Sequence, residues 1–131
     1  MKDDKLWTVF SIYIRLRDIV PGTEGYIRCI TSARLVHWKE SDAGHFISRR
    51  YLATKFHEQN VNAQSRNANR FNSGEQFAYS KAVDKKYGSG TADKLLALSR
   101  SPSKRFQFEI DTMILHYTEQ VKLLKAKNHI K

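Results

Sequence analysis

Apolar positions in residues 3–20 recur with two different periods. One subset alternates as the residues of a strand do. A second set, four apolar residues and an arginine, keeps the spacing of one helix face (Leu6, Phe10, Tyr13, Ile14 and Arg17). The charges favour the helix, because acids stand at its start and Arg15 and Arg17 stand near its end, where they suit the helix dipole. Pro21 and Gly22 follow as a stop. We therefore predict a helix over residues 3–20.

The middle of the chain alternates between short apolar stretches and polar ones. Residues 25–38 predict two β segments around a turn at 31–34, and residues 41–48 predict another short extended segment. A polar connection over 49–59 precedes a last short strand at 60–64. Residues 65–90 have a helical pattern, with Ser73 and Gln76 at capping-box spacing and Gly88 as the stop.

The last third of the chain has a purely helical pattern. Residues 91–100 predict a short helix that residues 101–103 interrupt. Residues 103–128 predict a long amphipathic helix with a single apolar face (Phe106, Ile110, Met113, Ile114, Tyr117, Val121 and Leu124). A length of 131 residues suits one domain, so we expect an α+β domain over 1–131 with a core at about 26–88 and C-terminal helices at about 91–127.

The net charge of the chain indicates which kinds of molecule it binds. Lys and Arg number 23 against 13 Asp and Glu, which gives a formal net charge of +10. This excess indicates a polyanionic partner: nucleic acid, an anionic membrane surface or an acidic protein. No apolar run approaches the roughly 18 residues needed to span a bilayer, and the first residues are acidic where a signal peptide would be basic and then apolar. We expect a cytoplasmic protein without membrane association.

Three stretches carry a family resemblance. They are "SDAGHF" at 41–46, "EQNVNAQ" at 58–64 and "SRNANRFNSG" at 65–74, in the order strand, loop, strand and helix. This arrangement resembles the ββα-metal, or HNH (His-Me finger), nucleases, and more narrowly the phage recombination nucleases of the NinG (Rap) family. Those enzymes are similar in their core to phage endonuclease VII and cut branched DNA. The resemblance implies a ββα-metal core and a bacterial host cell.

The same resemblance locates a metal site that this chain has lost. The family holds a structural zinc with two Cys-x-x-Cys pairs, which fall here on Cys29 and Ser32 and on Ser65 and Ala68. One thiolate cannot hold zinc, since a hydroxyl is a poor ligand and alanine is none. We predict that the protein contains no structural zinc.

Four residues match the catalytic positions of the family. His45 is the expected general base, since an unperturbed pKa of about 6.5 leaves histidine largely neutral at physiological pH. The resemblance implies that Asn60 orients the histidine and that Asn69 ligates Mg²⁺, or Mn²⁺, through its amide oxygen. Asp42 is the candidate charged ligand. Gly44 stands where many HNH enzymes have an acid directly before the base, and we expect it to let the backbone approach the substrate.

Basic residues around these positions are candidates for binding DNA phosphates (Arg49, Arg50, Arg66, Arg70, Lys81, Lys85 and Lys86). The predicted function is a metal-dependent endonuclease that hydrolyses branched DNA, for which a homodimer would supply two sites. Two alternatives stay open: a catalytically inactive, structure-selective DNA-binding protein on the same scaffold, and a basic RNA-binding protein.

Overall fold

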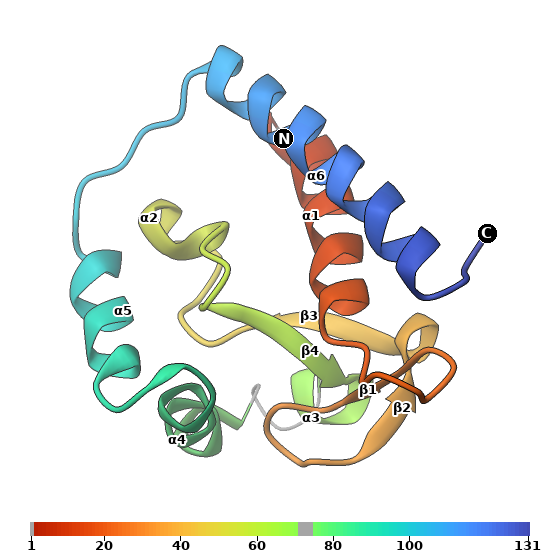
Figure 1. Ribbon diagram of the computed structural model, residues 1–131. Coiled ribbons are helices and arrows are strands. Elements are labelled where there is room, and N and C mark those ends of the chain that lie inside the picture. The colour runs from red at the N-terminus through yellow and green to blue at the C-terminus, as the bar shows by residue number, and fades with distance from the viewer. Residues whose placement is uncertain (1, 71–74) are drawn as a thin grey trace.

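The computed structural model describes residues 2–70 and 75–131 (Figure 1). Within these ranges the protein is a mixed α+β structure with six α-helices and two small antiparallel sheets. The elements follow the chain as α1 (Asp4–Arg17), β1 (Tyr26–Arg28), β2 (Leu35–His37), the 3₁₀ turn η1 (Trp38–Glu40), β3 (Ser41–His45), α2 (Leu52–Lys55), β4 (Val61–Ser65), α3 (Arg66–Arg70), α4 (Gln76–Tyr87), α5 (Thr91–Ser99) and α6 (Gln107–Lys127).

The first helix forms where the charge pattern favoured it, and the alternative strand is wrong. Leu6, Phe10 and Ile14, spaced four residues apart, are fully buried along one side of α1. Arg15 and Arg17 occupy the last turn, and the Asp18 N–H closes the helix by donating to the Ile14 carbonyl.

Both sheets are single hairpins. In the first, Ile27 of β1 faces Val36 of β2, and the turn between them brings Ala33 into the left-handed region with a φ of 63°. In the second, β3 and β4 pair from Ser41 opposite Ser65 to His45 opposite Val61. The expected short strands are therefore confirmed, and α3 follows β4 without a break.

Two expectations about the middle of the chain were too simple. The polar connection at 49–59 contains α2, whose Thr54 and Lys55 are buried. The helical stretch at 65–90 forms two helices, α3 and α4, and the expected capping residue Ser73 lies outside the described residues. The predicted stop is confirmed, since Gly88 ends α4 with a φ of 119°, a conformation that favours glycine.

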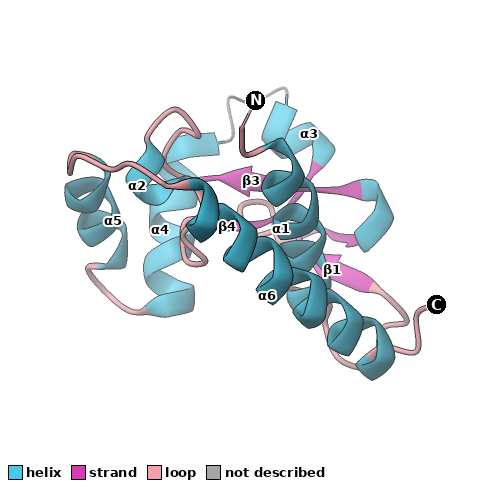
Figure 2. Cartoon of the chain, turned by 90° about the horizontal axis from the view of Figure 1, so that it is seen from above, coloured by secondary structure: helices cyan, strands magenta, loops and turns pink. Residues whose placement is uncertain are grey.

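The N-terminal and C-terminal helices lie side by side (Figures 1 and 2). The Phe10 ring of α1 meets the Tyr117 ring of α6 edge to face at 4.9 Å, and Ile110 is buried beside them. The predicted apolar face of α6 packs on the core, with one exception. Phe106 precedes the helix as its N-cap residue and is 52% exposed.

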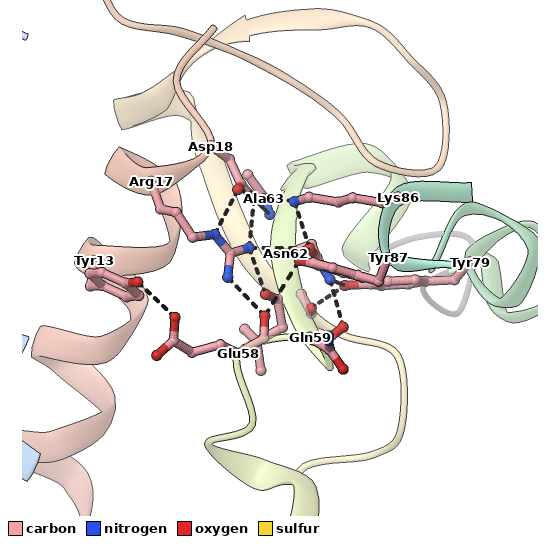
Figure 3. Close-up of polar contacts among 12 residues, drawn as sticks. Tyr13, Arg17, Asp18, Glu58, Gln59, Asn62, Ala63, Tyr79, Lys86 and Tyr87 are labelled. Carbon is pink, nitrogen blue, oxygen red and sulfur yellow. Dashed lines mark hydrogen bonds and ion pairs between the residues drawn. The ribbon is translucent and has the colours of Figure 1, made fainter. Parts of the chain in front are cut away.

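A polar network joins α1, β4 and α4 (Figure 3). The Arg17 guanidinium donates to the Asp18 carboxylate, to the backbone carbonyls of Glu58 and Val61, and to the Asn62 amide oxygen. Lys86 Nζ donates to the same Asn62 oxygen at 2.8 Å and pairs with Asp18 at 3.1 Å. The network positions β4, and therefore its partner β3, relative to the two helices.

The four positions at which the resemblance placed zinc ligands lie together in the fold. The Cys29 thiol accepts hydrogen bonds from the Ser32 side chain and from the Ser65 backbone N–H, and the Ser65 hydroxyl accepts from the Ala68 N–H. Burial raises the pKa of the thiol, but these hydrogen bonds and that of Thr31 outweigh burial and lower it to about 7. Hydrogen bonds thus connect the two segments here, and the absence of structural zinc stays a prediction for metal analysis to test.

Within the described ranges, no helix combines the length and apolar character needed to cross a membrane.

Candidate functional site

A cleft of about 530 Å³ opens beside β3. Its lining comes from α1, β3, the segment after β3, α3 and the start of α4 (Trp7, Ser11, Arg15, Ser41, Asp42, Ala43, His45, Arg49, Arg66, Asn69, Arg70 and Gln76). Six of the residues singled out in the sequence meet here: Asp42, His45, Arg49, Arg66, Asn69 and Arg70. Segments far apart in the chain therefore converge on one solvent-open site.

His45 ends β3, and its ring lies against α1. The imidazole stacks on the Trp7 ring with centroids 4.9 Å apart, and Nε2 lies 2.9 Å from the Lys55 carbonyl oxygen. A carbonyl oxygen can only accept, so Nε2 carries the proton and Nδ1 keeps a lone pair. Burial lowers the pKa of His45 to about 4, and the cations of Arg49 and Lys55 add to the effect. At physiological pH the ring is therefore a neutral base with a fixed tautomer.

Asp42 and Asn69 also line the cleft, and their side chains are hydrogen-bonded to each other. The Asn69 side-chain amide on α3 donates to the Asp42 carboxylate on β3 at 2.9 Å. Arg70 adds a bidentate fork to the same carboxylate, with both N–O distances 2.8 Å. Burial raises the pKa of Asp42, but the hydrogen bonds from Arg70 and Asn69 outweigh it and lower the pKa below its usual range. Asp42 is a carboxylate anion at neutral pH, held in place by three residues of α3, since Arg66 Nε also lies 3.8 Å from it.

Gly44 has a different role from the one expected. A Cβ at this position would overlap the side-chain amide of Gln64 and would lie 2.9 Å from Oδ1 of Asn69. The glycine is thus needed because the Gln64 and Asn69 side chains lie directly over the backbone of β3. The expectation that it admits substrate to the backbone is corrected: Gly44 makes room for the protein's own side chains.

Asn60 is fully buried, and its side chain forms hydrogen bonds with backbone groups. Its amide group donates to the carbonyls of Ile47 and Thr54, and its oxygen accepts from the Ile47 N–H at 2.7 Å. These bonds fix the loop that carries the Lys55 carbonyl, which in turn accepts the hydrogen bond from His45 Nε2–H. Asn60 therefore acts on His45 through the loop, and no direct bond joins the two side chains in the described part of the chain.

The basic residues separate into two groups. Arg49, Arg66 and Arg70 line the cleft, and Arg49 also lies 5.6 Å from the Trp7 ring centroid. Arg50, which lies over the Tyr51 ring, and the three lysines of α4 do not line it (Lys81, Lys85 and Lys86). Lys86 instead binds Asp18 and Asn62 in the network of Figure 3. Only the first group is placed to meet a ligand in the cleft.

Three lining residues of α1 escaped the sequence interpretation. Trp7, Ser11 and Arg15 follow one another at four-residue spacing on the helix, which presents them to the cleft together. Burial lowers the pKa of Arg15, whose guanidinium lies 5.5 Å from the Trp38 ring. These three residues form a second stripe beside the apolar face of α1, and their spacing was a signal of a second contact surface. Arg15 was interpreted from the sequence only as a charge that suits the end of the helix.

The fold and the cleft define a basic α+β protein in which an acid, an amide and a neutral histidine line one cavity. The family model described as Bacteriophage Lambda NinG protein matches residues 2–127 of this chain. The chain belongs to the NinG family of phage proteins associated with recombination. No curated protein and no protein of known structure shows significant similarity to it.

Proposed function

We propose that the protein is a metal-dependent endonuclease that hydrolyses phosphodiester bonds in branched DNA. The observation that carries the proposal is the convergence of a neutral His45, the Asp42 carboxylate and Asn69 in one cleft with four arginines. Phosphodiester hydrolysis needs an activated water and relief of negative charge on the phosphate. The chain offers a group for each requirement.

The chemistry of Asp42 and Asn69 fits a divalent cation. A carboxylate and an amide oxygen are hard donors of the kind Mg²⁺ and Mn²⁺ accept, and Mg²⁺ needs only one or two carboxylates when phosphate and water complete its shell. Both side chains line the cleft, and the Asn69 amide nitrogen, which would have to exchange places with Oδ1 for ligation, lies 2.9 Å from the Asp42 carboxylate. A cation held by them would supply charge stabilisation for the phosphate and for the departing 3′ oxygen.

His45 is the proposed general base. Its Nε2–H is committed to the Lys55 carbonyl, so Nδ1 is the nitrogen that takes a proton from water. A phosphodiester bound in the cleft would favour the protonated ring, because an anion near a histidine raises its pKa. Substrate binding therefore strengthens a base that is buried and neutral in the free protein.

In this proposal Arg70 binds the Asp42 carboxylate in the free protein and a DNA phosphate in the complex. In the free protein its fork holds the Asp42 carboxylate. If Asp42 held a cation, the guanidinium would be free to bind a phosphate oxygen, for which the same fork is suited. Arg49 and Arg66 line the same cleft and supply further phosphate contacts without reading base sequence.

The deciding experiment is incubation of a labelled four-way DNA junction with the protein and Mg²⁺, beside His45→Gln, Asp42→Asn and Asn69→Ala variants. We expect cleavage by the wild type and a loss of about 10²–10⁴-fold in the His45 variant, the range of a lost general base. His57→Gln is the matched control, since this histidine does not line the cleft. Equal cleavage by the wild type and His45→Gln would refute the assigned base.

A second candidate function is favoured by one contact. Because Arg70 occupies both oxygens of Asp42, the cleft could serve as a basic DNA-binding site without a metal ion. This candidate predicts junction binding that EDTA leaves unchanged and no nicking at any Mg²⁺ or Mn²⁺ concentration. Cleavage of the junction by the wild type would exclude it.

A further inference from the structure

A phenylalanine stands in solvent at the edge of the cleft. Phe77 lies in the first turn of α4 and is 74% exposed. The residue before it, Gln76, lines the cleft. One exposed apolar side chain is ordinary on a protein surface, so the position of Phe77 needs a second observation before it suggests a ligand.

That observation is the arrangement of cations and rings around the edge. Lys81, one helical turn after Phe77, places its ammonium 4.6 Å from the ring centroid. A second such pair stands nearby, where Arg50 lies 5.4 Å from the ring of the 42% exposed Tyr51. Tyr51 and Gln76 line a smaller hollow together, so Gln76 borders both hollows. Exposed rings that carry cations are typical of surfaces that bind unpaired nucleotides.

We propose that Phe77 and Lys81 form a binding site for an unpaired nucleobase next to the cleft. The Lys81 ammonium covers one face of the ring and can meet the backbone phosphate of the same nucleotide. Phe77 is 74% exposed, so much of its ring can be reached by a base that stacks on it. Paired bases inside a duplex are stacked on their neighbours and have no free face to place on the Phe77 ring. The site therefore selects DNA in which the branch leaves a base unstacked.

This inference rests on the proposed function in one respect, which is that the ligand of the cleft is DNA. It adds the source of selectivity, because the arginines of the cleft contact phosphates in any DNA. Phe108 is a natural control, since it is 69% exposed and belongs to α6, which contributes no residue to the cleft. An effect of exposed phenylalanine as such would appear equally at Phe108.

The test compares binding of two labelled DNAs in EDTA, so that no cleavage occurs. One is a splayed-arm DNA with unpaired adenines at the fork, and the other is a fully paired duplex of the same length. Phe77→Ala is expected to weaken splayed-arm binding by about 5- to 150-fold, which corresponds to the roughly 1–3 kcal/mol of one base–aromatic stack. Duplex binding should change less than about twofold. Phe77→Trp should retain selectivity, Phe77→Leu should lose it, and Phe108→Ala should match the wild type.

Equal losses on both DNAs in Phe77→Ala, or no loss on either, would overturn the inference. Retained selectivity in Phe77→Leu would also overturn it, because leucine keeps the apolar surface without the ring. Two outcomes separate this inference from the proposed function. If the wild type binds neither DNA, both ideas are refuted. If the wild type cleaves junctions and Phe77→Ala keeps full selectivity for the splayed-arm DNA, this inference alone is refuted. Circular dichroism and urea unfolding should show that Phe77→Ala is folded like the wild type, since the ring is exposed.

Discussion

His45 takes its protonation state from its surroundings. Burial, with the ring stacked on Trp7, lowers its pKa to about 4 from the ordinary value of 6.5, although the hydrogen bond to the Lys55 carbonyl acts in the opposite direction. The unfolded chain therefore binds a proton at higher pH than the folded one. The contribution of His45 to stability is complete above about pH 6.5 and is lost as the pH falls toward 4.

This gives a prediction for a titration followed by NMR. The His45 ring signals should not shift between pH 8 and about 5, whereas an exposed histidine titrates near 6.5. Trp7→Ala should move the His45 midpoint upward, because the ring then gains solvent. A wild-type midpoint above 6 would contradict the burial of the base.

Gly44 gives a second residue-scale prediction. Gly44→Ala should lower the free energy of unfolding by about 1–3 kcal/mol, because its Cβ meets the buried Gln64 side chain. Truncating that neighbour in the same chain, in Gly44→Ala/Gln64→Ala, should cost less than the sum of the two single changes. Urea unfolding of the four proteins measures this coupling. Additive costs would mean that the two side chains do not compete for space.

The sequence predicted the part of the site that is local in the chain. Asp42, His45 and Asn69 were found because motif spacing places them on neighbouring elements of one hairpin and the helix after it. The wall of the cleft from α1 was missed, because Trp7 and Arg15 approach β3 only through tertiary packing. The role of Gly44 was misjudged for the same reason: Gln64 crosses it from the opposite strand.

At the scale of elements, the mostly buried guanidinium of Arg17 joins α1 to β4. Arg17 bonds to the side chains of Asp18 and Asn62 and to two carbonyls near the start of β4. Burial raises the pKa of Asp18, but Arg17 and Lys86 outweigh burial and lower it, so the carboxylate stays charged. Removing the arginine would leave this buried anion with Lys86 as its remaining cation.

We therefore expect Arg17→Met to reduce the free energy of unfolding by about 3 kcal/mol or more, the range measured when a buried ion pair loses one partner. Arg17→Met/Asp18→Asn should recover part of the loss, because the unpaired charge is then gone. Arg34→Met is the control, as this arginine is exposed. Chemical denaturation that finds equal stability for Arg17→Met and Arg34→Met would contradict the structural role of the network.

The elements were predictable where one signal dominated. The apolar face of α6, the strands of the β3–β4 hairpin and the glycine at the end of α4 all appear where the pattern placed them. The assignment of two helices, α3 and α4, within residues 65–90 and the small helix α2 were not foreseen. Thr54 and Lys55 of α2 are buried by packing and by a pair between Lys55 and Asp3 near the start of the chain, a contact that no local period contains.

For the whole molecule, the net charge of +10 means that the proposed DNA binding should depend on salt. Each phosphate contact should contribute a slope of about −0.9 in a plot of log affinity against log salt concentration on duplex DNA. Arg49→Gln should reduce the slope by about one contact, whereas Lys86→Gln should leave it unchanged, because Lys86 is paired with Asp18 away from the cleft. Fluorescence anisotropy at several salt concentrations decides this, and equal changes in both variants would contradict the placement of the interface.

The most direct test of the nuclease proposal is chemical rescue of the base. His45→Ala should leave a space between the Trp7 ring and the Lys55 carbonyl that an imidazole molecule fits. We predict that His45→Ala fails to cleave a four-way DNA junction in Mg²⁺ and that added imidazole restores a measurable rate, with no effect on the wild type. Junction cleavage by His45→Ala at the wild-type rate without imidazole would contradict the account.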